Sequence, residues 1–158
     1  MIKVLFICHG NICRSPMAEF VLKNKVKELG IEDKFYIASA ATSTEEIING
    51  VGNPVYPPAR EELLKHGISC EGKRAVQLKK SDYDEYDYLI GMDSMNIKNI
   101  ERITGHKNGD KIKMLLSYCG SNDSVIDPWY SCRFDDTYRD VNRGCDAFIQ
   151  YLRKNGEI

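Results

Sequence analysis

The chain has 158 residues, of which 42% are hydrophobic and 28% are charged, and its formal net charge is -1. This composition is typical of a globular protein, predicts one domain spanning residues 1–158, and excludes a disordered or fibrous chain. A net charge so close to zero gives no reason to expect nucleic acid or an anionic membrane as a partner, so any affinity for anions must be built locally.

Six cysteines are spread along the chain: Cys8, Cys13, Cys70, Cys119, Cys132 and Cys145. A chain of this length and apolar content does not need a disulfide framework, and Met1 to Lys3 leads directly into an apolar run without a secretory leader. We therefore expect free thiols and a reducing, cytoplasmic compartment. The cysteine spacing matches no zinc-site pattern and no run approaches membrane-spanning length, so we expect no metal, no cofactor and no membrane insertion.

The first predicted strand leads into a short loop and then a helix. Ile2–Ile7 is an apolar run interrupted only by Lys3, which is typical of a strand covered on both faces. The helix is expected over 16–29, with Ser15 as its N-cap and Gly30 as its end. A strand, a loop and a helix N-terminus in this order form a ready anion site, because free N–H groups and the positive end of the helix dipole converge there.

Strands and helices alternate through the rest of the chain. We expect strands at 35–39, 87–92 and 111–116, helices at 57–66, 94–104 and 136–152, and long surface loops at 40–56 and 117–135. This alternation predicts an α/β fold: a doubly wound, four-stranded parallel sheet with helices on both faces. Ligands in such sheets bind outside the carboxyl ends of the strands, where the phosphate-binding loop after the first strand and the two long loops should meet.

The expected phosphate-binding loop consists of eight residues: Cys8, His9, Gly10, Asn11, Ile12, Cys13, Arg14 and Ser15. Its amides can turn inward around a tetrahedral dianion, with Gly10 accepting a positive φ and Asn11 tolerating the left-handed region. Arg14 offers a planar fork that matches two phosphate oxygens. The loop is thus expected to cradle a phosphoryl group.

Cys8 lies at the floor of this cradle. Inward amides, the helix dipole and Arg14 all favour a negative sulfur, and the Ser15 hydroxyl can donate to it, so we expect Cys8 to be a thiolate nucleophile at neutral pH. The alternative is an inert buried thiol at the end of a core strand. Cys13 either packs as an ordinary thiol or pairs reversibly with Cys8 under oxidant, which would protect the nucleophile from irreversible oxidation.

A leaving oxygen needs a proton donor, and Asp127 is the candidate. Pro128 stiffens its loop, and Trp129 with Tyr130 could form an apolar wall that raises its pKa. An Asp-Pro pair is also an everyday turn signal, so the spacing alone does not decide this role. The three histidines, His9, His66 and His106, are expected to be solvated or structural.

Taken together, these residues resemble the low-molecular-weight protein tyrosine phosphatases. The family pattern V-x-F-x-C-x-G-N-x-C-R-S-P is matched over 4–16, S-A-A-T-S over 39–43, G-N-P over 52–54, M-D-S-x-N over 92–96 and D-P-W-Y over 127–130. The match runs through nearly the whole chain. It implies a cytoplasmic, metal-free enzyme that hydrolyses phosphotyrosine in proteins or peptides, and small aryl phosphates, with inorganic phosphate as product and inhibitor.

The resemblance also implies a role for individual residues. Cys8 would be the nucleophile, Arg14 would bind the phosphoryl group, and Asp127 would act as general acid and then as general base. Ser15 would support the thiolate, while Asn11, with Ser39, would hold the shape of the loop. Trp129 and Tyr130 would form an aromatic rim for the substrate ring, and Cys13 would be the protective second thiol.

Two departures from the family pattern concern the surroundings of the loop. Members often carry a histidine tied to the loop asparagine, but the corresponding stretch here is 71–75, Glu-Gly-Lys-Arg-Ala, so this support is missing or replaced. Glu45 stands where an aromatic rim residue is common. Its charge should disfavour acidic phosphopeptides.

Three other functions are compatible with the same loop. A protein-arginine phosphatase is associated with threonine before the second loop cysteine, where this chain has Ile12, whose bulk favours a flat phenyl ring. A thiol-dependent arsenate reductase needs two further closely spaced cysteines near mid-chain, where only Cys70 lies. A non-catalytic phosphate-binding module would result if Asp127 were misplaced.

Overall fold

A four-stranded parallel sheet forms the centre of the structure, a computed structural model that describes all 158 residues. Its strands are β1 (Ile2–Cys8), β2 (Phe35–Ala41), β5 (Tyr88–Gly91) and β6 (Ile112–Met114), in the order β2-β1-β5-β6. The predicted parallel α/β sheet is confirmed. β1 is paired on both sides and has apolar side chains on both faces, which is why its sequence is a continuous hydrophobic run.

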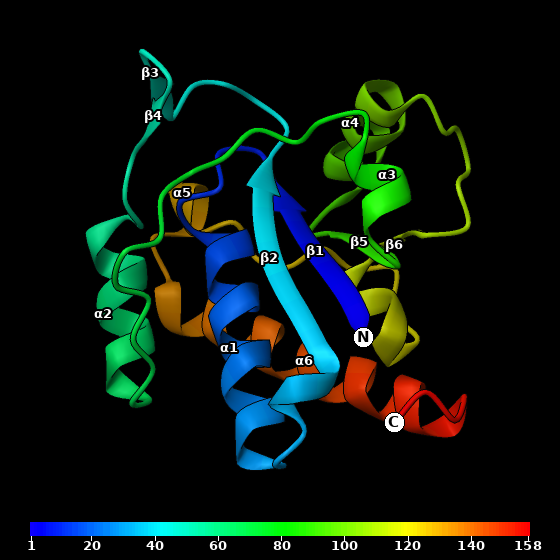
Figure 1. Cartoon of the computed structure of the whole chain (residues 1–158). Helices are drawn as coiled ribbons and strands as arrows, with labels where there is room; N and C mark the ends of the chain where they lie inside the picture. Colours follow the sequence, from blue (N-terminus) through cyan, green and yellow to red (C-terminus); the bar gives the residue numbers. More distant parts are fainter.

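Helices cover both faces of the sheet (Figure 1). On one side lie α1 (Arg14–Glu28), α2 (Pro57–Lys65) and α6 (Phe134–Lys154), and on the other lie α3 (Asp82–Glu85) and α4 (Ser94–Thr104). Alternate residues of β1 supply the two cores: Val4 and Phe6 enter a cluster of 25 buried residues, and Leu5 and Ile7 enter one of 8. The sheet therefore anchors β1, and with it Cys8, from both sides.

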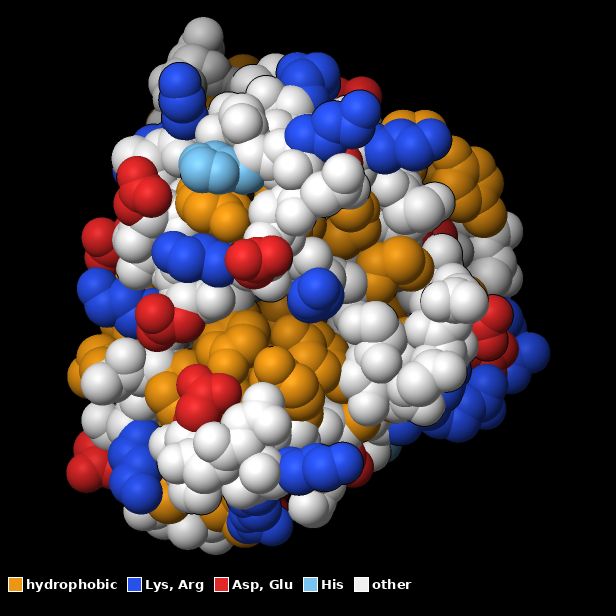
Figure 2. Space-filling view, turned by 90° about the vertical axis from the view of Figure 1, so that its right-hand side faces the viewer, with side chains coloured by type: hydrophobic (Ala, Val, Ile, Leu, Met, Phe, Trp, Pro, Cys, Tyr) orange, Lys and Arg blue, Asp and Glu red, His pale blue; other side chains and the backbone are white.

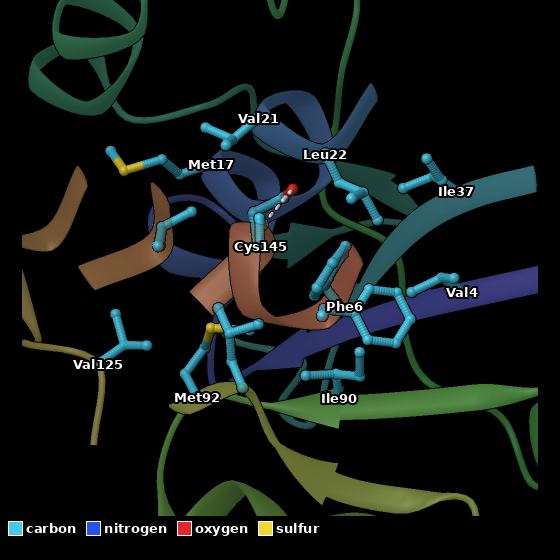
Figure 3. Close-up of a cluster of buried hydrophobic side chains, with 14 of the residues drawn as sticks. Val4, Phe6, Met17, Val21, Leu22, Ile37, Ile90, Met92, Val125 and Cys145 are labelled. Carbon is cyan, nitrogen blue, oxygen red and sulfur yellow. Dashed lines mark hydrogen bonds between the residues drawn. The ribbon is translucent and has the colours of Figure 1, made fainter. Parts of the chain in front are cut away.

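The larger core packs α1 and α6 against the sheet (Figure 3). Phe6 lies among side chains from α1, β2 and β5, and Cys145 of α6 lies at the centre of the cluster. Burial raises the pKa of the Cys145 thiol, whose Sγ donates to the Ala18 carbonyl at 3.9 Å. Cys145 is thus a packing residue.

Figure 2 shows the side of the molecule that lies on the right in Figure 1, with hydrophobic side chains gathered below the middle of the face and charged side chains of both signs around them. This side carries the edge strand β6 and the C-terminal end of α6. Near that end, Tyr88 and Tyr118 pack edge-on against Phe148, at centroid distances of 5.1 and 5.0 Å. None of the helices is both long and apolar enough to cross a membrane.

The start of α1 differs from the prediction. The helix begins at Arg14, its N-cap is Cys13, and no side chain caps it, so Ser15 is not the N-cap. Ser15 lies inside the first turn, where its hydroxyl is directed to Cys8 instead. Similarly, α6 begins at Phe134, two residues before the predicted start.

Both long connections contain short elements that were predicted as loop. The first holds a hairpin of β3 (Ile47–Ile48) and β4 (Val51–Gly52), closed by Asn49 and Gly50 with φ of 52° and 78°. Asn-Gly is the preferred pair for such a two-residue turn, so the signal was present in the sequence. The second holds η2 (Leu115–Cys119) and α5 (Pro128–Ser131), and a further short helix, η1 (Glu32–Lys34), precedes β2.

Gly52 permits a close approach that ties the hairpin to the segment after α2. A β-carbon at this position would overlap the Ala75 carbonyl, while the Arg74 guanidinium donates to the Gly52 carbonyl at 3.0 Å. Asn53 also accepts a bond from the Ala75 N–H at 2.9 Å. The hairpin is therefore held by backbone contact rather than by a hydrophobic core of its own.

Gly52→Ala should lower the free energy of unfolding by about 1–3 kcal/mol, because the added methyl group pushes against backbone that cannot move freely. Urea unfolding measures the change. The neighbouring Val51→Ala is the control, since Val51 is 58% exposed and its truncation should cost little. Equal stability of the two variants would contradict the close-approach argument.

Candidate active site

The loop between β1 and α1 is held from outside by the 42–56 segment. The carbonyls of Cys8, His9 and Ile12 accept hydrogen bonds from the amides of Thr42, Ser43 and Tyr56 at 3.0, 3.0 and 2.9 Å. In a trans peptide unit the N–H points opposite to the carbonyl. The amides of residues 9, 10 and 13 are therefore turned away from this segment, toward the inner side of the loop.

Asn11 fixes the shape of the loop. Its backbone is left-handed, with φ of 60°, and its side chain is 1% exposed and fully engaged. Nδ2 donates to Ser15 Oγ at 2.8 Å and to Ser39 Oγ at 2.9 Å, and Oδ1 accepts from the Val76 N–H at 3.0 Å. The Val76 amide thus gives Asn11 support that the sequence did not reveal.

Gly10 does not play the part predicted for it. Its φ is not positive, so the loop needs no glycine there for a left-handed turn. A β-carbon at Gly10 would instead lie 3.3 Å from the Glu46 side chain. A larger residue at this position would therefore press against the Glu46 side chain, which lies just before β3.

The Cys8 sulfur lies at the carboxyl end of β1 and is surrounded by hydrogen-bond donors. Residue 8 is 4% exposed, Ser15 Oγ is 3.0 Å from Sγ, and the Asn11 N–H donates to Sγ at 3.3 Å. Because Ser15 Oγ already accepts from Asn11, its own proton is available for the sulfur. The surroundings are thus arranged for a negatively charged sulfur.

Arg14 extends from the first turn of α1 and is almost completely buried. Its Nη1 donates to the Val125 carbonyl at 3.2 Å and lies 2.9 Å from Asp93 Oδ2, while Nη2 lies 3.5 Å from Asp127 Oδ2. These contacts come from the loops after β5 and β6. They orient the guanidinium plane beside the loop.

Asp93 lies next to Arg14, and sequence reasoning included it only as part of the M-D-S-x-N match. Its Oδ1 accepts from the Asn96 amide at 2.7 Å and caps α4, and its Oδ2 pairs with Arg14. The signal that could have revealed it is topological: β5 is a neighbour of β1, so the first residues after both strands meet at one sheet edge.

Asp127 is brought next to Arg14, but its surroundings differ from the prediction. It caps α5, where Oδ1 accepts from the Trp129 amide at 3.0 Å. Trp129 and Tyr130 are 66% and 84% exposed, so they do not form an apolar wall that shields the carboxyl group from water. The side chain of Asp127 is itself 33% exposed.

Two further aromatic residues that sequence reasoning missed, the exposed Tyr56 and the partly buried Phe134, belong to the same group as Trp129. The Tyr56 ring lies 6.1 Å from the rings of both Trp129 and Phe134. Tyr56 follows the hairpin, and its amide bonds the Ile12 carbonyl, so this aromatic group adjoins the phosphate-binding loop. A flat ring can pack against such a surface.

Glu45 lies on the other margin of the loop and is paired. Its Oε2 is 3.0 Å from His9 Nε2, and the two side chains are 71% and 55% exposed. His9 therefore points outward, as predicted.

The six cysteines are all free thiols in the structure. Burial, together with the charges of Cys8 and Asp127, raises the pKa of the half-buried Cys13 to about 12. Cys13 is thus a neutral thiol at physiological pH. No contact here tests its pairing with Cys8, which stays a prediction.

Comparison with known proteins agrees with this geometry. The sequence profile of the family described as "Low molecular weight phosphotyrosine protein phosphatase" matches residues 3–158. The chain belongs to this family. It is therefore a hydrolase of the protein-tyrosine-phosphatase type.

Members of this low molecular weight phosphatase family resemble the chain over its full length. It is 37% identical to the low molecular weight protein-tyrosine-phosphatase YfkJ of Bacillus subtilis over 160 residues, covering 100% of both chains. The crystal structure of YfkJ covers 98% of this chain and 96% of its own, with a TM-score of 0.90. SP-PTP of Streptococcus pyogenes (38% identity, 96% and 93% covered) and the arginine phosphatase DARP of Drosophila (28%, 96% and 98%) both give 0.84.

Asp93→Asn should separate the two roles of Asp93. Asparagine still caps α4 but lacks the charge that holds Arg14, so kcat/KM for an aryl phosphate should fall about tenfold while the melting temperature changes little. Asp93→Ala, which removes both contacts, should lower both quantities. An unchanged kcat/KM in Asp93→Asn would mean that the Val125 carbonyl and the loop suffice to hold the guanidinium.

Proposed function

We propose that this chain, acting as one catalytic domain over 1–158, hydrolyses phosphotyrosine in proteins and peptides through a phosphocysteine intermediate on Cys8. The observation that carries the proposal is the convergence on one sulfur: Ser15 Oγ and the Asn11 amide lie 3.0 and 3.3 Å from Cys8 Sγ. Arg14, the first residue of α1, is buried, and its guanidinium is held between the carboxylates of Asp93 and Asp127.

In the first step Cys8 attacks phosphorus and the bond from phosphorus to the tyrosine oxygen breaks. Arg14 binds two of the phosphoryl oxygens, and the inward amides of the loop bind the charge that develops on them. A dianion in the loop competes with Asp127 for Arg14, which releases the Asp127 carboxyl group. The released group, carrying a proton taken up from solvent, gives that proton to the leaving oxygen.

In the second step Asp127 takes a proton from water, and the water oxygen attacks the phosphocysteine. The sulfur–phosphorus bond breaks, inorganic phosphate leaves, and the Ser15 hydroxyl stabilises the sulfur as a leaving group. Phosphate thus binds where the substrate binds, and should act as a competitive inhibitor. Because the cycle requires a reduced nucleophile, we place the enzyme in the reducing cytoplasm.

The aromatic group formed by Tyr56, Trp129 and Phe134 supports an aromatic ester as substrate. Such a surface accepts a phenyl ring by packing, and Ile12 occupies the place next to Cys13 where bulk favours a flat ring over a guanidinium. Tyrosine phosphatases and arginine phosphatases share this fold, since DARP is an arginine phosphatase. The choice between the two substrates therefore rests on these side chains.

The test is turnover of matched phosphotyrosine and phosphoarginine peptides, followed by phosphate release. We expect hydrolysis of phosphotyrosine and at least tenfold lower kcat/KM on phosphoarginine, with no turnover by Cys8→Ser. Equal or faster hydrolysis of phosphoarginine would overturn the substrate assignment. Tight binding without release of phosphate would leave only a phosphate-binding module.

Asp127→Asn should lower kcat by about 10²–10⁴-fold on aryl phosphates with poor leaving groups, since it removes general acid–base help. The loss should shrink as the leaving phenol becomes more acidic, and the inhibition constant for phosphate should change far less than kcat. Asp123→Asn is the control, because Asp123 is exposed in the same loop and makes no side-chain ion pair. Wild-type rates in Asp127→Asn would make the assignment of the acid wrong.

Peroxide should inactivate the enzyme reversibly through a Cys8–Cys13 disulfide. Peroxide converts the Cys8 sulfur to a sulfenic acid, and the Cys13 thiol then forms the disulfide with loss of water. After excess peroxide, dithiothreitol should restore activity to the wild type but not to Cys13→Ser, where peroxide oxidises the unpaired sulfenic acid further to a sulfinic acid that dithiothreitol does not reduce. Cys132→Ser, which lacks an exposed thiol, should recover like the wild type. Full recovery of Cys13→Ser would contradict the pairing.

A further inference from the structure

A buried ion pair lies behind the phosphate-binding loop, away from any place where the substrate binds. Lys73 Nζ is 3.4 Å from Glu19 Oε1, and the two side chains are only 11% and 6% exposed. Burying two charges costs free energy that their attraction does not always return, so such a pair is weak evidence for stability alone. The reaction described above does not use it.

A chain of hydrogen bonds connects this pair to the nucleophile. Glu19 Oε1 accepts from Ser39 Oγ at 2.6 Å, and Ser39 Oγ accepts from Asn11 Nδ2 at 2.9 Å. The same Nδ2 donates to Ser15 Oγ at 2.8 Å, and Ser15 Oγ lies 3.0 Å from Cys8 Sγ. Three side chains, those of Ser39, Asn11 and Ser15, thus join Glu19 to the Cys8 sulfur through four hydrogen bonds.

The direction of each bond in this chain is fixed. A carboxylate only accepts and an amide nitrogen only donates, so the single proton of Ser39 goes to Glu19. For the same reason Ser15 accepts from Asn11 and has its own proton left for Cys8. If Glu19 carried a proton and donated it to Ser39, the Ser39 proton would have no acceptor and the link to Asn11 would weaken.

Lys73 contacts the chain at two points. Besides Glu19, its Nζ donates to the Ser39 carbonyl at 3.0 Å. Burial lowers the pKa of the Lys73 ammonium, and the attraction of Glu19 partly offsets this. The lysine belongs to the 71–75 stretch, where the family often carries a histidine, so here a lysine lies in the place of that support.

We propose that Lys73 is a positioning residue for the nucleophile: its ammonium keeps Glu19 an ionised acceptor, which orders Ser39 and Asn11 and directs the Ser15 proton at the Cys8 sulfur. Lys73 acts through these residues and does not contact the substrate. The proposal rests on the proposed function only for the role of the sulfur. The bond network is tested without any turnover.

The experiment is carboxymethylation of Cys8 by iodoacetate at a series of pH values, followed by mass spectrometry of the Cys8 peptide. In Lys73→Met the pH of half-maximal rate should rise by about one unit, the size expected when a hydrogen bond to a charged group weakens. At pH values well below both midpoints, carboxymethylation should slow by about tenfold as a consequence. Lys73→Arg, which keeps a cation, should recover most of the shift.

Lys23→Met is the matched control. Lys23 pairs with the same carboxyl group, through Glu19 Oε2 at 2.6 Å, but its side chain is 43% exposed. A solvated pair contributes little. The midpoint of Lys23→Met should therefore equal that of the wild type.

The proposal fails if the Lys73→Met midpoint is unchanged, even where the melting temperature falls, or if Lys73→Arg behaves like Lys73→Met. Should Lys73→Met not fold, Ser39→Ala breaks the same chain nearer the sulfur and must raise the midpoint, and an unchanged value there overturns the proposal. If the wild type shows no phosphatase turnover, only the proposed function fails. The role of Lys73 can still be tested, because carboxymethylation of Cys8 remains measurable.

Discussion

The left-handed conformation of Asn11 is the constraint on which the site depends. A non-glycine residue in this region is strained and persists only where its surroundings hold it. Here one side chain makes three hydrogen bonds, to Ser15, Ser39 and Val76, in a place that water does not reach. These bonds turn the loop so that the Asn11 amide reaches the Cys8 sulfur. Because Ser15 Oγ accepts a bond from Asn11, the Ser15 proton is left to bond the same sulfur.

The sheet explains why distant parts of the chain can meet this loop. β1 lies in the middle of four parallel strands, and its carboxyl end adjoins the ends of β2 and β5. Ser39 lies on β2 and Asp93 lies two residues after β5, whereas Val125 and Asp127 lie in the segment between η2 and α5. The two hydrophobic cores hold β1 from both faces, which leaves the loop little freedom to relax.

The charges around the site are arranged in opposing pairs at different depths. Arg14 is held by Asp93 and approached by Asp127 on the side open to solvent, whereas Lys73 and Glu19 form a buried pair on the reverse of the loop. The outer carboxylate can exchange its partner for a phosphoryl group. The inner pair has no such alternative, so it can serve the shape of the loop while the outer groups take part in chemistry.

The sequence by itself determined the alternating strands and helices, and it singled out the loop from Cys8 to Ser15 together with Asp127, because apolar periodicity and local motifs act over a few neighbouring residues. It did not determine the second role of Asp93, the Tyr56 ring, the Val76 support of Asn11 or the contact of Lys73 with Glu19. Gly10 and the expected cap at Ser15 were misread for the same reason: a local rule was applied where a residue elsewhere in the fold decides. Only the tertiary structure brings positions 19, 39 and 73 behind position 11, because those contacts depend on strand order and packing rather than on spacing along the chain.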